Sequence, residues 1–112
     1  MDAIDFGKFV FVKCTVYRGA FSDERVFEVP EAEIDDQTGY TGVAPLHYFQ
    51  KQDANPFSAS EPAPGQNLPG MLAARMISNG GDKARVAIPD GEGITVPLAL
   101  LAKRTHAPHV SL

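Results

Sequence analysis

The sequence predicts a mainly β fold, a small barrel or sandwich of antiparallel hairpins with short helical turns. Apolar residues alternate over 8–17 and again over 85–96, which is the pattern of strands with one buried face. Within the second stretch a Pro-Asp-Gly turn joins two short runs, and a proline follows the second run. Alternation, a tight turn and a terminating proline together indicate hairpins.

The first hairpin is expected in the N-terminal thirty residues. The strand 8–17 has one wholly apolar face, made by Val10, Val12, Cys14 and Val16. A turn at 18–20 leads into a second strand at 25–29. Pro30 ends that strand. The acidic residues after it predict the first turn of a short helix, because acids complement the positive end of the helix dipole.

The middle of the chain is expected to be less regular. The segment 39–42, Gly-Tyr-Thr-Gly, predicts a turn, and 43–49 predicts a third strand that Pro45 interrupts, which confines it to an edge or a bulge. The segment 50–69 contains four prolines and no apolar period, so it predicts a long Pro-rich loop. Phe57 and Leu68 are its only side chains suited to anchoring the loop to a core.

The C-terminal third contains the clearest hairpin. A strand at 71–77, apolar on both faces, precedes a turn at 79–82. In the hairpin that follows, 89–91 forms the turn, and β-branched residues at alternate positions form the buried face: Val86, Ile88, Ile94 and Val96. Pro97 ends the second strand, and the leucines of 98–101 predict one turn of helix. The remainder predicts a short strand or a tail that is flexible over 105–112.

The order of strand, tight turn, strand, Val-Pro and leucine-rich turn in 70–103 resembles the C-terminal part of SH3-like barrels of the Tudor and KOW kind. The resemblance implies an SH3-like barrel, and a superfold of this kind carries no function by itself. A second similarity is internal. Val29-Pro30-Glu31-Ala32-Glu33-Ile34 and Val96-Pro97-Leu98-Ala99-Leu100-Leu101 each follow a hairpin and agree at four positions in six, a match too short to predict a repeat.

Length and composition limit the remaining classes. The 112 residues are expected to form one domain with a core that needs no disulfide or metal. Cys14 is the only cysteine, and its place on the apolar face of a strand predicts a core side chain. His106 and His109 flank a helix-breaking proline, so neither a metal site nor a cofactor is expected. Without a signal peptide or a long apolar run, the sequence predicts a cytoplasmic protein with no membrane partner.

Charge and aromatic residues suggest where a ligand would bind. The net charge is −4, but 22–36 alone carries −6, from seven acids and one arginine. Such an edge attracts cationic partners, and aromatic faces beside carboxylates suit a cation. The sequence therefore predicts a non-catalytic binding or interaction module for a cationic peptide, a protein partner or a small cationic molecule. The candidate residues are Glu33, Asp35, Asp36, Tyr40, His47, Tyr48, Phe49 and Phe57.

Three alternatives stay open. A homo-oligomeric structural subunit would bury the two-sided apolar strand 71–77 between copies. A nucleic-acid-binding domain would use a basic patch, which the net negative charge disfavours: Arg75, Lys83, Arg85, Lys103 and Arg104. An enzyme would combine His47 with an acid of 22–36 or with Cys14. No motif in the sequence has the spacing of a catalytic signature, so no catalytic residue is assigned.

Overall fold

The computed structural model describes residues 9–103, and these form strands with two single turns of 3₁₀ helix. The turns are η1 (Leu46–Tyr48) and η2 (Leu98–Leu100). The strands are β1 (Phe9–Arg18), β2 (Glu24–Ile34), β3 (Gln37–Pro45), β4 (Phe49–Lys51), β5 (Asn67–Gly80), β6 (Lys83–Ala87), β7 (Gly93–Pro97) and β8 (Leu101–Lys103). The predicted fold class, mainly β with short helical turns, is confirmed.

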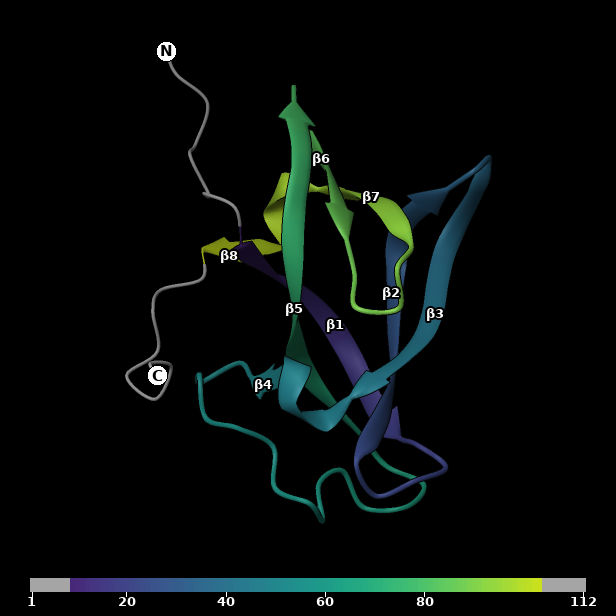
Figure 1. Ribbon diagram of the computed structural model, residues 1–112, viewed down its shortest axis with the longest axis vertical. Coiled ribbons are helices and arrows are strands. Elements are labelled where there is room, and N and C mark those ends of the chain that lie inside the picture. The colour runs from purple at the N-terminus through teal and green to yellow at the C-terminus, as the bar shows by residue number, and fades with distance from the viewer. Residues whose placement is uncertain (1–8, 104–112) are drawn as a thin grey trace.

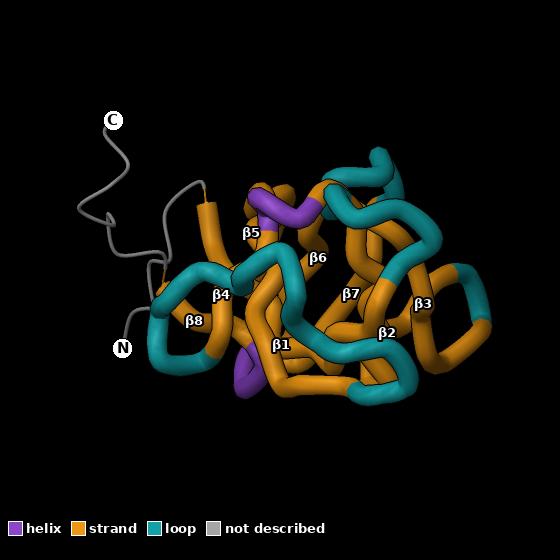
Figure 2. Tube along the Cα trace, turned by 90° about the horizontal axis from the view of Figure 1, so that it is seen from below, coloured by secondary structure: helices purple, strands orange, loops and turns teal. Residues whose placement is uncertain are grey.

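Five strands close an antiparallel barrel in the order β1, β2, β7, β6 and β5 (Figure 1). A bridge between Glu33 of β2 and Thr95 of β7 completes the ring. The other three strands lie outside it, with β3 on β2, β4 on β5 and β8 on β1. Seen from below, the loop before β5 crosses one end of the barrel (Figure 2). This small closed barrel is consistent with an SH3-like fold.

The interior of the barrel is filled by alternate residues of its strands, as the sequence predicts. The apolar face of β1 is buried and belongs to the same core cluster as the predicted face of the β6–β7 hairpin. The turn of that hairpin is also confirmed, because Gly91 has a φ of 96° and Asp90 accepts a hydrogen bond from the backbone of Glu92 at 2.9 Å. Outside the barrel a second apolar cluster joins Phe11, Met71, Ala73 and Ala102.

Three predictions for the middle of the chain are wrong. No helix follows Pro30, because β2 continues through that proline to Ile34. The pairing of β2 with β3 shifts between Val29 and Glu33, and such a bulge tolerates a residue that cannot donate to the ladder. The segment 39–42 is part of β3 and not a turn. The chain reverses instead at Asp35, whose φ is 46°, and Pro45 ends β3 where a strand over 43–49 was expected to continue.

The two halves of the chain repeat one structural unit. Each unit is a long strand, a hairpin, a 3₁₀ turn and a short closing strand: β1, β2, β3, η1 and β4 in the first, and β5, β6, β7, η2 and β8 in the second. Each closing strand pairs with the long strand of the other unit, β4 with β5 and β8 with β1. Phe49, Leu72, Val12 and Leu101 thus form one row, and an approximate two-fold axis passes through its central pair.

Local details agree with this two-fold relation. The backbone N–H of Leu46 donates to the carbonyl of Asp23 at 2.8 Å, and that of Leu98 donates to Asp82 at 2.9 Å. The prolines before the two 3₁₀ turns also match, with φ and ψ of −60° and 146° at Pro45 and of −61° and 145° at Pro97. The structural equivalent of Pro97 is therefore Pro45. The internal match of 29–34 with 96–101 in the sequence pairs segments that are not equivalent.

The units differ in the length of their hairpins. β2 and β3 extend past the barrel, whereas a short turn joins β6 to β7. The β2 extension reaches Thr95 and covers the outer edge of β7. Within residues 9–103 no strand pairs with the corresponding outer edge of β3.

The Pro-rich loop spans 52–66, between β4 and β5. Phe57 is buried in the core and Leu68 packs against it, so both predicted anchors are confirmed. Gly70 allows β5 to pass close to the loop, because a Cβ there would lie 3.0 Å from Phe57 Cζ and 2.8 Å from Val16 Cγ2. Residues 9–103 contain no helix with the length and apolar character needed to cross a bilayer.

Candidate functional site

The predicted aromatic residues do not form one cleft. Phe49 and Phe57 retain only 2% and 6% of their exposure, and both belong to the core cluster. The ring of Phe49 packs against Phe27 with centroids 6.0 Å apart. These two side chains stabilise the barrel and the loop, and in this structure they offer no face to a ligand.

Tyr40 is half-buried on β3 and is paired with an acid that the sequence did not indicate. Its ring lies 5.9 Å from that of Phe27, and its hydroxyl donates to Asp90 Oδ2 at 2.5 Å. Burial and this hydrogen bond raise the pKa of Tyr40 well above its usual range. Asp90 comes from the β6–β7 turn, so the contact ties the two hairpins together.

His47 and Tyr48 form a separate exposed pair on η1. Their ring centroids lie 4.4 Å apart, with the ring planes tilted by 33°. They follow Pro45 at one end of β3, while Asp35 and Asp36 precede the other end of the same strand. The structure therefore does not bring the predicted acids and these aromatics together.

The predicted acids instead meet two of the predicted bases. Lys83 Nζ lies 2.8 Å from Glu33 Oε2, and this contact raises the pKa of Lys83. Arg85 and Thr95 join Glu33, Asp35 and Asp36 around a polar hollow of about 280 Å³. The cationic charge of Lys83 and Arg85 is thereby offset locally by carboxylates.

Of the other candidate nucleic-acid residues, Arg75 shares one exposed face of the β5–β6 pair with Lys83 and Arg85. Arg75 lies on β5 opposite Ala87 of β6, and Lys103 lies on β8, on the far side of β1. Arg104 falls outside the described residues, as do His106, His109 and the predicted tail 105–112. Arg75, Lys83 and Arg85 are therefore neighbours on one face, where Lys83 is paired with Glu33 and Arg85 adjoins Asp35 and Asp36.

Cys14 and His47 lie in different environments. Cys14 is buried in the core cluster, and burial raises its pKa to about 12. A thiol in this state is a poor nucleophile at neutral pH. His47 is exposed on η1, at the surface.

The outer edge of β3 has no strand paired with it within residues 9–103. β3 is nine residues long and carries no charged side chain. On its inner edge, β2 places Glu24, Glu28 and Glu33 directly opposite Pro45, Thr41 and Thr38. Three further acids of the hairpin, Glu31, Asp35 and Asp36, are exposed, and the structure records no ion pair for them within 9–103.

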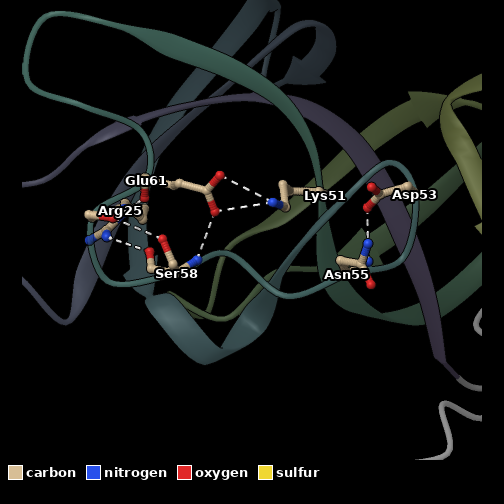
Figure 3. A network of polar contacts seen from close by, with 7 residues as sticks. Arg25, Lys51, Asp53, Asn55, Ser58 and Glu61 are labelled. Atoms are coloured by element: carbon tan, nitrogen blue, oxygen red, sulfur yellow. Dashed lines mark hydrogen bonds and ion pairs between the residues drawn. The ribbon is translucent and has the colours of Figure 1, made fainter.

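Arg25 is the structurally important residue that sequence reasoning missed. Its side chain is fully buried, and its guanidinium donates only to backbone carbonyls (Figure 3). Two acceptors, Ser22 and Glu24, are on its own strand and turn, and three are in the Pro-rich loop: Ser58, Ala59 and Glu61. The sequence feature that could have identified Arg25 is its position as the one base among the seven acids of 22–36.

The same loop is braced from its other side. Lys51 Nζ lies 3.1 Å from Glu61 Oε2, and Glu61 also accepts a hydrogen bond from the backbone of Ser58 at 3.0 Å. These contacts, with that of Ser58 the largest, lower the pKa of Glu61. The Pro-rich segment is therefore held as an ordered cover over one end of the barrel.

Comparison with protein-family models, curated proteins and solved structures gave no significant match to this chain.

Proposed function

We propose that this chain is a non-catalytic binding module that accepts an extended, positively charged peptide as an added strand on the outer edge of β3. One observation carries the proposal: a nine-residue uncharged strand has an edge that no strand of residues 9–103 pairs with, and it lies in a hairpin rich in acids. Folded proteins commonly protect such edges with lysine, bulges or covering segments, and an unprotected edge is a template for another strand. The resemblance of 70–103 to Tudor and KOW barrels concerns the fold and adds neither a function nor a ligand.

The internal two-fold relation supports a strand as the occupant. In the second unit the outer edge of β7 is covered by the β2 extension, which pairs through Glu33 and Thr95. The first unit has no such cover within 9–103, because the β6–β7 turn is too short to supply one. A peptide strand on β3 would therefore take the position that the chain itself fills on β7.

Charge supports a cationic peptide. Exposed Glu31, Asp35 and Asp36 lie near the start of β3, and Glu28 lies across from Thr41 on its inner edge. A lysine or arginine side chain of an added strand would extend toward these carboxylates at a surface where attraction depends on salt.

The test is a titration of ¹⁵N-labelled protein with a capped peptide of alternating threonine and lysine, against the same peptide with glutamate in place of lysine. We expect shifts of the Thr41, Gly42 and Val43 amides with the lysine peptide alone, and weaker binding as salt is raised. Tetramethylammonium is the third ligand in the titration, because a small cation would bind the acidic surface without pairing as a strand. Equal binding of the two peptides, or shifts confined to other strands, would contradict the proposal.

Val43→Lys supplies a variant of the edge itself, because it puts a positive charge where the peptide would pair. Val43 is 44% exposed, and Ile77 of β5 is 50% exposed, so Ile77→Lys is a matched control. Val43→Lys should weaken peptide binding several-fold with an unchanged melting temperature, while Ile77→Lys should leave binding intact.

The same edge favours one second candidate, a homo-oligomer in which β3 pairs with β3 of another copy. Salt separates the two functions, because pairing two acidic edges is opposed by like charges. Self-association would strengthen as salt is raised, whereas cationic peptide binding would weaken. Light scattering at low and high salt measures the first directly.

A further inference from the structure

Both long strands change partner midway, and the two places where this happens differ. β5 pairs with β4 over Gly70 to Leu72 and with β6 from Arg75 onward, so Ala73 and Ala74 face no strand on that side. By the two-fold relation, β1 pairs with β8 over Val10 to Val12 and with β2 from Thr15 onward. We call these interruptions the β5 seam and the β1 seam.

The β5 seam is hollow. A groove of about 320 Å³ runs along it, lined by Phe9, Tyr48, Ala73, Ala74, Arg75, Ala87, Ile88, Pro89 and Gly91. Phe9 and Tyr48 supply exposed aromatic rings from β1 and η1. Volume and lining fall within the range of small-ligand sites, which combine apolar walls with a few polar groups.

The β1 seam shows why the β5 seam is open. In the β1 seam Thr15 pairs with Glu28. The two-fold relation makes this pair equivalent to Arg75 and Ala87 in the β5 seam. The carboxylate of Glu28 accepts a hydrogen bond from the Tyr17 hydroxyl at 3.0 Å. This bond holds the Glu28 side chain over the surface of β1 and β2. In the β5 seam the position of Glu28 is an alanine and the position of Thr15 is an arginine, so the groove is open and carries a cation.

Among residues 9–103, Arg75 is the only charged residue that lines the β5 groove. It lies opposite Phe9 on one side and Ala87 on the other. The structure records no hydrogen bond or ion pair of its guanidinium within residues 9–103. An exposed guanidinium beside aromatic faces binds a carboxylate through two parallel N–H donors, a geometry that lysine cannot offer.

We infer that the β5 groove binds an aromatic carboxylate, with the ring against Phe9 and Tyr48 and the carboxylate on Arg75. The chemistry is shared by a free aromatic acid and by the C-terminal phenylalanine of a peptide. This ligand is opposite in charge to the one proposed for β3, and the two sites lie on different strands, so either can fail without the other.

The test uses two acids, each with its neutral amide: 4-phenylbutyrate with 4-phenylbutyramide, and N-acetylphenylalanine with N-acetylphenylalaninamide. Binding is followed by the methyl resonances of Ala73 and Ala87 and by the side-chain N–H of Arg75. We expect the acids to bind about tenfold more tightly than their amides, since a charge-assisted bidentate contact is lost in the amide. The stronger acid identifies the source of the carboxylate.

Two variants and a control complete the test. Arg75→Gln should remove the preference for acid over amide, and Ala87→Glu, which installs the residue of the β1 seam, should prevent binding of the acids. Arg85→Gln removes a neighbouring arginine outside the groove and should change nothing. The inference is overturned if acid and amide bind equally, if Arg75→Gln keeps the preference, or if the methyl groups of Ala73 and Ala87 do not respond.

Discussion

Arg25 places a guanidinium inside the protein, and no carboxylate of residues 9–103 forms an ion pair with it. Its exposure is 0%, and five backbone carbonyls accept its hydrogen bonds, the shortest at 2.6 Å from Glu24. Burial, with a smaller effect from nearby Arg18, lowers the pKa of Arg25. Carbonyl dipoles here replace water around the charge, and three of them belong to the loop, so the loop and the buried cation depend on each other.

Arg25→Ala should therefore destabilise the protein by about 3 kcal/mol, because several charge-assisted bonds are lost and the carbonyls keep no partner. Arg18→Ala is the control, since Arg18 is partly exposed and donates one bond to Ala59. Its cost should stay below about 1 kcal/mol. Urea unfolding of both variants measures the difference, and similar values for the two would refute this role of Arg25.

Cys14 predicts a pH dependence at the alkaline end. Its pKa is raised to about 12 by burial, so the folded state disfavours the thiolate while the unfolded state does not. The resulting stability is present below the pKa of the unfolded thiol and is lost as pH rises from there toward 12. At pH 8 a disulfide reagent should react with Cys14 only as fast as the protein opens, and at once in denaturant. Rapid labelling of the folded protein would show that the thiol is accessible.

At the scale of elements, the close approach of β5 to the Pro-rich loop depends on Gly70. An added Cβ would also meet the carbonyl oxygen of Gln50 at 3.1 Å, so backbone as well as side chains would have to move. Gly70→Ala should cost about 2 kcal/mol through overpacking. Gly80→Ala is the matched control on the same strand, because a Cβ there has no atom within 4 Å. Its effect should remain within about 0.5 kcal/mol in thermal unfolding, and equal losses would contradict the packing argument.

The elements that the sequence predicted well are those in which the local residue pattern is compatible with only one secondary structure. Alternating β-branched residues around Pro-Asp-Gly define the β6–β7 hairpin, and Val10 to Val16 define β1. The end of β2 was missed because a proline is compatible with either a helix start or a bulge, and only pairing with β3 decides between them. Likewise Gly39 and Gly42 indicate a turn locally, yet lie within a strand whose partner requires it to extend.

Only the residue types of the candidate site were predictable from the sequence, and not their arrangement. Acids and aromatics in 28–57 were visible, but burial of Phe49 and Phe57 follows from contacts between distant segments. The pairing of Glu33 with Lys83 joins residues fifty positions apart, and no local pattern indicates it. The groove on β5 requires knowing where that strand changes partner, which a single sequence does not show.

At the scale of the molecule, the two units are bound together by reciprocal pairing of their closing strands. Separate chains of residues 1–54 and 55–112 should therefore copurify when expressed together, and neither should fold alone. Amide dispersion in NMR spectra of each half and of the pair tests this. A half with native-like dispersion by itself would show that the exchange of strands is dispensable.

This exchange gives the molecule the geometry of a strand-swapped homodimer whose two subunits have been fused by residues 52–66. Two identical copies must mutate together, so any groove or edge opened in one opens in both. Fusion removes that constraint. The two halves accordingly differ: the first has the longer hairpin with its acids, and the second has Arg75 and Ala87 in the places of Thr15 and Glu28, so the molecule presents two chemically different faces.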